Sequence, residues 1–212
     1  MQTRTLVLTT ALIAAGIGSA ILVGCATTPN DAEVSAKATA VMKASFKEHG
    51  QAKLDRLDQD DMQKSCSEYS GKALPKDVAE RIEKANLASI KWPADGKYVG
   101  DWRAGERIAQ SGQGMQYSDD PKQPSGANCY ACHQLAPQEL SFGTMGPSLY
   151  QFGKLRGYTD EMRKYTYGKV YNADAYSACT NMPRFGHKGI LTAQQIADVV
   201  ALLMDPASPV NK

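Results

Sequence analysis

The sequence predicts an all-α fold with long loops between its helices. Apolar residues recur at helical spacing in several segments, residues that cap helices precede the strongest of them, and 18 Gly and 10 Pro indicate many turns. With 42% hydrophobic and 22% charged residues, the 212-residue chain has the composition of a soluble globular protein with one or two small domains. The formal net charge is only +2 and no long basic block is present, so the composition gives no indication of nucleic-acid binding.

The clearest expected helix lies near the C-terminus. Thr192 and Gln195 match a capping box at its start, and Asp205-Pro206 ends it. Its apolar stripe consists of Ile196, Val199, Val200 and Leu203. Another helix is expected to begin just after Asp101, which is a suitable N-cap. Loops that contain Gly143, Gly146, Pro147 and Gly153 are expected between these two helices.

Three further helical stretches are expected upstream, and together they form a helical N-terminal extension over residues 32–98. The stretches are residues 32–48, residues 57–69 and a segment that begins after Pro75. Bulky apolar residues are few here, so we expect the extension to pack on the downstream domain rather than to fold alone. A turn-rich segment at 92–96 precedes that second domain, residues 99–212.

The N-terminus carries an export signal. Arg4 precedes an apolar run over residues 6–23, which is typical of a secretory signal peptide over residues 1–24. The sequence Leu22-Val23-Gly24-Cys25 resembles a bacterial lipobox, in which Cys25 would be lipidated and residues 25–31 would form a tether. The alternative is ordinary cleavage nearby, for instance after Ala26. Both interpretations predict a periplasmic protein, which in the first case is anchored to the membrane through Cys25.

One motif carries the chemistry: Cys129-Tyr130-Ala131-Cys132-His133 is the attachment pattern of a c-type haem. Two thiols three residues apart on a helical turn can each add to one vinyl group of the same porphyrin, and the next residue then offers its imidazole to the iron. A bare Cys-x-x-Cys is also compatible with a redox dithiol or half a zinc site. The adjacent His133, the export signal and the absence of a second Cys pair favour a single haem c.

The second axial ligand of the iron must come from elsewhere in the chain. Met182 stands in a polar loop beside a proline, and a stiff loop suits a weak thioether ligand better than it suits core packing. His187 and Met145 are the alternatives, and His49 is expected at the surface. Ligation by His133 and Met182 would fill both axial positions, which suits electron transfer and leaves no open site for a substrate.

Two cysteines remain after the haem motif and Cys25 are set aside. In an oxidising compartment Cys66 and Cys179 most simply form one disulfide. A reactive or free cysteine is the alternative.

From Gly100 to Pro206 the chain resembles class I cytochromes c. The shared features are a capped first helix with a glycine, the Cys-x-x-Cys-His motif, a Gly-Pro-x-Leu loop, a Met-Pro loop and a C-terminal helix. The resemblance implies a class I cytochrome c fold with the N-terminal extension packed on it. It also implies that the Pro147 carbonyl orients His133, that Gly105 lets the first and last helices cross closely, and that Met182 is the distal ligand.

Nearly the whole mature chain is similar to the SoxX family, the monohaem subunit of the SoxAX cytochrome of bacterial sulfur oxidation. The most specific stretches are Tyr98 to Trp102, Asn128 to Gln134, Gly146 to Gly157 and Cys179 to Gly186. The similarity implies a heterodimer with a SoxA-type cytochrome, an L-cysteine S-thiosulfotransferase that joins thiosulfate to a cysteine of the carrier protein SoxYZ. The catalytic centre is then expected on SoxA, and this chain would pass electrons to a downstream c-type cytochrome.

The main alternative is a free, diffusible periplasmic monohaem electron carrier. A permanent subunit predicts an apolar patch around the exposed haem edge, whereas a diffusible carrier predicts a small contact ringed by charges.

A basic stretch lies after the Gly-Pro loop, and its role is open. Arg156 is the candidate for a contact with a haem propionate or with a partner, and a solvated charged face is the alternative. The stretch consists of Lys154, Arg156, Arg163, Lys164 and Lys169.

Overall fold

The computed structural model describes residues 30–212, so the signal peptide, Cys25 and most of the tether lie outside the described residues. Within the described part the secondary structure is helical, apart from one isolated β-bridge between His49 and Ala52. The all-α prediction is therefore confirmed. No helix among residues 30–212 is both long enough and apolar enough to cross a bilayer.

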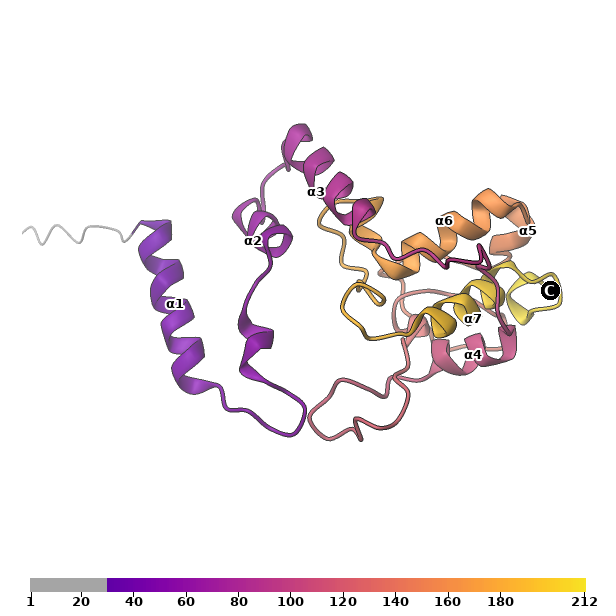
Figure 1. Cartoon of the computed structure of the whole chain (residues 1–212), viewed down its shortest axis with the longest axis horizontal. Helices are drawn as coiled ribbons and strands as arrows, with labels where there is room; N and C mark the ends of the chain where they lie inside the picture. The colour runs from indigo at the N-terminus through magenta and orange to yellow at the C-terminus, as the bar shows by residue number, and fades with distance from the viewer. Residues whose placement is uncertain (1–29) are drawn as a thin grey trace, which may run out of the picture. The chain divides into compact units, whose positions relative to one another are not determined.

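The helices follow one another along the chain as Figure 1 shows. The α-helices are α1 (Asp31–Ser45), α2 (Asp61–Glu68), α3 (Lys76–Ala88), α4 (Trp102–Gln110), α5 (Phe152–Arg156), α6 (Asp160–Tyr171) and α7 (Ala193–Met204). The 3₁₀ turns are η1 (Leu54–Leu57), η2 (Cys129–Ala131), η3 (Ala173–Ala175) and η4 (Pro209–Asn211). The chain divides into two compact units, residues 1–41 and 42–212, and the second contains every element from η1 onward.

The expected single helix over residues 57–69 is a shorter structure. The 3₁₀ turn η1 ends at Leu57, and α2 begins only after Asp60. Asp60 caps α2: its side chain accepts from the Gln63 amide at 3.0 Å, and the Gln63 side chain accepts from the Asp60 amide at 3.0 Å. This reciprocal capping box sets the start of the helix, which periodicity alone places too early in the chain.

From residue 42 onward, the extension packs on the domain downstream of it. Asn86 in α3 is buried, and its side-chain oxygen accepts from the amide of the buried Asn172 at 2.9 Å. Asn172 also donates to the Ser89 hydroxyl at 3.0 Å. The Asn172 Nδ2 group is thus paired from two sides by α3 and the residue after it, which favours this arrangement because an unpaired buried donor would be costly; the Asn172 Oδ1 has no partner among the described residues.

Helices α4 and α7 cross at close range, as Figure 1 shows. A side chain on Gly105 would collide with the backbone of Asp198 and with Leu202, so only glycine permits this crossing. Asp198 is buried, and its carboxylate accepts from the Asp101 amide at 2.9 Å. The expected N-cap of α4 and the expected capping box of α7 are both present.

Helix α6 was not among the helices expected from the sequence pattern. Its buried face carries Thr166, Tyr167, Val170 and Tyr171, and aromatic and hydroxyl side chains do not make a conventional apolar stripe. The start signal was present: the Thr159 hydroxyl accepts from the Met162 amide at 3.2 Å, and two acidic residues occupy the first turn. Helix α6 packs on α7 and forms one wall of a cavity that also contains the Cys-x-x-Cys-His motif.

Candidate functional site

The cavity beside the Cys-x-x-Cys-His motif has a volume of about 400 Å³ and opens within the second unit. Five groups of residues enclose it: the motif with the residues just before it, the Gly-Pro loop with α5, one face of α6, the Met-Pro loop, and Leu203 of α7. The lining residues with reactive or polar groups include Cys129, Cys132, His133, Pro147, Arg156, Lys169 and Met182. Most of the remaining wall is apolar, contributed by side chains such as Leu149, Phe152, Val170, Phe185 and Leu203.

The motif adopts a tight turn that brings its three reactive groups to one cavity. Cys129–Ala131 forms the 3₁₀ turn η2. The Cys132 and His133 amides both donate to the Cys129 carbonyl, at 3.1 Å and 2.9 Å. Both thiols and the imidazole line the cavity as a result. This is the arrangement that attachment of one porphyrin by two thioether bonds requires.

The imidazole of His133 is held from behind by the Gly-Pro loop. Its Nδ1 lies 2.7 Å from the Pro147 carbonyl oxygen, and a carbonyl can only accept, so Nδ1 carries the proton and Nε2 is the nitrogen available to a metal. Gly146 packs directly on the ring, because a Cβ at this position would overlap the imidazole. The Gly146 amide donates to the Cys132 carbonyl at 2.8 Å, which fixes the loop to the motif.

The electrostatics of the cysteines favour haem over a thiolate site. Burial raises the pKa of the Cys129 thiol to about 12, and the neighbouring Cys132 adds to the effect. A zinc ligand or a redox nucleophile needs an accessible thiolate, so a thiol with this pKa is poorly suited to either role. Conversion to an uncharged thioether removes the ionisable group and suits the apolar wall. The residues present fit a covalently attached haem.

Met182, the predicted second ligand of the iron, lies in the wall of the cavity. It lines the cavity, is partly buried against the core, and its amide donates to the Thr180 hydroxyl at 3.3 Å. Met145 also lines the cavity, but it is 74% exposed and precedes Gly146, the residue that supports His133. Met145 thus lies on the loop that supports His133, whereas Met182 lies on a different loop of the cavity wall and would be the residue to hold the iron together with His133.

The two remaining histidines lie away from the cavity. His187 is absent from its lining; its Nδ1 lies 3.2 Å from the Ser89 hydroxyl. Burial, together with the positive charges of Arg184 and Lys188, lowers the pKa of His187. His49 packs edge-on against Tyr117, with the ring centroids 4.5 Å apart.

Two cationic side chains, Arg156 and Lys169, line the cavity. Only Arg156 was a candidate site residue on the sequence alone. Arg156 is exposed and its guanidinium lies 5.4 Å from the centroid of the Phe152 ring. Lys169 is half-buried on α6: its ammonium group donates to the Ala173 carbonyl at 3.2 Å, and burial lowers its pKa. In the sequence, Lys169 is one residue of the basic stretch. Only the position of α6 in the fold shows that Lys169 lines the cavity. Both are suitable partners for the two haem propionates.

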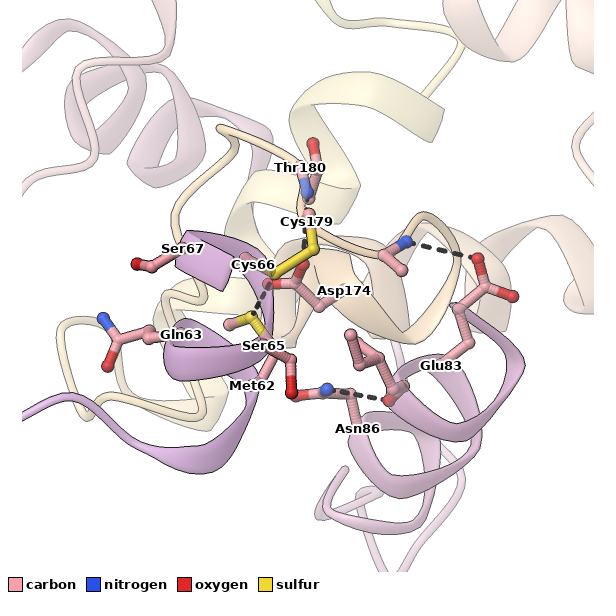
Figure 2. Close-up of a disulfide and its surroundings, with 12 residues drawn as sticks. Met62, Gln63, Ser65, Cys66, Ser67, Glu83, Asn86, Asp174, Cys179 and Thr180 are labelled. Atoms are coloured by element: carbon pink, nitrogen blue, oxygen red, sulfur yellow. Dashed lines mark hydrogen bonds between the residues drawn. A yellow bond between two sulfur atoms is a disulfide. The ribbon is translucent and has the colours of Figure 1, made fainter. Parts of the chain in front are cut away.

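A disulfide joins the extension to the Met-Pro loop. Cys66 in α2 is bonded to Cys179, with S–S 2.00 Å and Cα–Cα 5.5 Å (Figure 2). It links residues 113 positions apart, for which the chain-entropy model gives a stabilisation of about 5 kcal/mol.

An ionic network lies next to this bridge and was not foreseen from the sequence. The buried guanidinium of Arg184 donates to the Asp60 carboxylate at 2.6 Å and lies 3.8 Å from the carboxylate of the buried Asp174. Lys188 donates to the same Asp60 oxygen at 2.8 Å. Burial alone would raise the pKa of Asp60, but hydrogen bonds from Lys188, the Gln63 amide and Arg184 hold it well below its ordinary value.

Replacement of Asp60 with asparagine tests this network. Asparagine can still cap α2, so Asp60→Asn removes mainly the charge facing Arg184, and we expect a loss of about 3 kcal/mol of stability at pH 7. A carboxylate with a depressed pKa stabilises the fold above its unfolded-state pKa of about 4 and loses that contribution as pH falls. The difference between wild type and variant should therefore shrink by up to about 1.4 kcal/mol per pH unit below pH 4. Urea unfolding at pH 7 and pH 3 measures it; a pH-independent difference would contradict the assignment.

Comparison with known proteins agrees with the geometry. A family model described as cytochrome c matches residues 122–205, the segment that runs from just before the motif to the end of α7. The chain is also 43% identical over 157 residues to an uncharacterized lipoprotein of Aquifex aeolicus (strain VF5), and the match covers 73% of each chain.

Proposed function

Because the chain belongs to the cytochrome c family, and so binds haem c covalently for electron transfer, we propose that it is the monohaem electron-transfer subunit of a SoxAX-type cytochrome. When bound, the haem supplies an iron that accepts and releases one electron. The single observation that carries the electron-transfer role is the cavity that brings Cys129, Cys132, His133 and Met182 together. One attachment motif in the whole sequence supports one haem.

The protein's own residues are arranged to hold the redox group, not to transform a substrate. His133 is oriented by the Pro147 carbonyl, and Met182 stands ready to fill the other axial position. The apolar wall keeps water from the buried part of the porphyrin, and a Met thioether favours the reduced iron. Catalysis of thiosulfate conjugation to SoxYZ therefore belongs, in this proposal, to the SoxA-type partner.

The surface near the cavity supports a permanent partner over a diffusible carrier. Apolar side chains are exposed on the loop before the Gly-Pro turn, where Met145 lines the cavity, and on α5, which contributes Phe152 and Arg156 to the same cavity. They are Leu140 (88% exposed), Met145 (74%) and Leu155 (75%). Bulky apolar residues exposed this strongly at a redox site suit a stable subunit interface, whereas a diffusible carrier needs a small contact ringed by charges.

The location proposed is the periplasm, with an anchor at the N-terminus. The homologous Aquifex protein is named a lipoprotein, and the lipobox ending at Cys25 supports lipidation of this chain as well. A lipid anchor would keep the subunit and its partner at the membrane surface, near a downstream c-type cytochrome acceptor.

Affinity purification tests the SoxAX assignment directly. The tagged chain is isolated from native cells grown on thiosulfate, and co-purifying proteins are identified by mass spectrometry. We expect a second c-type cytochrome in a 1:1 ratio. A chain that elutes alone with an ordinary cytochrome spectrum would contradict the heterodimer and leave the free electron carrier.

A further inference from the structure

We propose that α2 of the N-terminal extension is a clamp that holds the Met182 loop in place, with Cys66 and Asp60 as positioning residues for the axial methionine. The proposal rests on the proposed function in one respect, namely that Met182 is an iron ligand. It goes further by assigning a function to the N-terminal extension, namely to hold the Met182 loop of the haem domain in position.

The first contact of the clamp lies just before Met182. The Cys66–Cys179 disulfide fixes the chain three residues upstream of the methionine (Figure 2). On the next residue, the Thr180 amide donates to the Asp174 carboxylate at 3.2 Å, and the Thr180 hydroxyl accepts from the Met182 amide at 3.3 Å. The position of Met182 is thus linked to α2 through a short series of bonds.

The second contact lies just after Met182. Arg184, two residues downstream, is bound to Asp60 at 2.6 Å. Asp60 is the N-cap of α2, and Cys66 lies within the same helix. One short helix therefore holds the loop on both sides of the methionine, by a covalent bond on one side and by a partly buried ion pair on the other.

The loop that carries Met182 needs this support because it separates two cavities and has one on each side. Residues Thr180 to Pro183 line the cavity with the haem motif, and the same residues also line a second cavity of about 480 Å³. The far side of that second cavity is formed by α2 residues, including Met62, Gln63 and Cys66. Empty space behind Met182 would let the loop retreat from the iron, and a thioether is a weak ligand that cannot itself prevent this.

The test is the double variant Cys66→Ser/Cys179→Ser in the holoprotein, with Asp60→Asn as a second variant that leaves the disulfide intact. The readout is the affinity of ferric haem for added imidazole, which binds only when the methionine has left. An apparent affinity scales with the fraction of the open state, so we expect it to rise about tenfold in the double variant and less in Asp60→Asn. The sulfur-to-iron charge-transfer band should weaken in parallel, while the haem stays attached.

Asn86→Ala is the matched control. It breaks the buried pair that holds α3 on Asn172 and so destabilises the packing of the extension, but it leaves the Cys66–Cys179 disulfide and the Asp60–Arg184 ion pair in place. We expect it to leave imidazole affinity and the charge-transfer band unchanged. Hydrogen–deuterium exchange of residues 180–185 gives a readout that does not use the haem spectrum, and it should accelerate only in the two clamp variants.

The failures of the two proposals are distinguishable. If Met182→Ala keeps the charge-transfer band, Met182 is not the ligand and the ligation in the proposed function is wrong. If Met182→Ala loses the band, but the double variant binds imidazole like wild type and its loop exchanges no faster, the clamp is overturned while the electron-transfer function stands. An Asn86→Ala variant that matches the clamp variants would also overturn it, because the effect would then depend on general stability.

Discussion

Replacement of both Cys129 and Cys132 with alanine is expected to abolish haem attachment and to leave the domain largely unfolded. The haem would occupy a cavity of about 400 Å³ whose walls come from α5, α6, α7 and three loops. A closed, empty apolar cavity costs about 24 cal/mol per Å³, and because this cavity opens to solvent, the value of on the order of 10 kcal/mol that its volume gives is an upper bound. That is comparable to the whole stability of a typical domain, about 5–15 kcal/mol, so most of the haem-dependent core should collapse or melt.

Haem staining after denaturing electrophoresis and far-ultraviolet circular dichroism measure the two effects. The single variants Cys129→Ala and Cys132→Ala serve as controls, because each retains one thioether bond together with His133 and should keep part of the haem and most of the helix content. A double variant that retains wild-type helix content and thermal stability without haem would show that the core is complete without the cofactor, contrary to the cost expected from the cavity volume.

Much of the fold was predictable because its strongest signals are local. The capping box of Thr192 and Gln195, the N-cap at Asp101 and the apolar stripe of α7 depend on residues within one helix, and the structure contains all of them. Helix α6 was missed for a physical reason. Its buried face uses Tyr167 and Thr166, whose burial depends on aromatic neighbours such as Trp92 and Tyr98, far away in the sequence.

The residues of the candidate site also fall into two classes, those that the sequence reveals and those that only the fold brings together. The motif at Cys129 to His133 is contiguous, so its chemistry could be inferred from spacing alone. Lys169 and the Asp60–Arg184 pair could not be recognised, because partners 124 positions apart meet only in the folded chain. Charged residues in a sequence are solvated by default, and nothing local distinguishes a buried Arg184 from an exposed one.

The extension and the haem domain are therefore best understood as one functional unit from residue 42 onward. A disulfide, a partly buried ion pair and a buried amide pair connect them, and the first two converge on the same loop. If these contacts served only to stabilise the fold, they could lie anywhere between the extension and the haem domain. Instead, two of them lie on either side of one methionine. This concentration supports the proposed role of Met182 as a ligand of the iron.

Replacement of Met182 with alanine is expected to keep the haem attached but to change its redox and ligand-binding properties. Loss of the thioether removes the ligand that favours ferrous iron, and axial ligands set haem potentials over a range of roughly 0.8 V. We expect a fall on the order of 200 mV, loss of the charge-transfer band, and binding of carbon monoxide to the reduced protein. Potentiometric titration and absorption spectra before and after carbon monoxide measure these changes.

Met145→Ala is the matched control for this prediction, because Met145 lines the same cavity and is more exposed than Met182. It should leave the potential and the charge-transfer band close to wild type. The opposite pattern, with the band lost in Met145→Ala and kept in Met182→Ala, would move the axial ligand to the loop that supports His133. A wild-type protein that already binds carbon monoxide readily would point instead to a haem sensor, since an electron carrier with both axial positions filled excludes the gas until its methionine leaves.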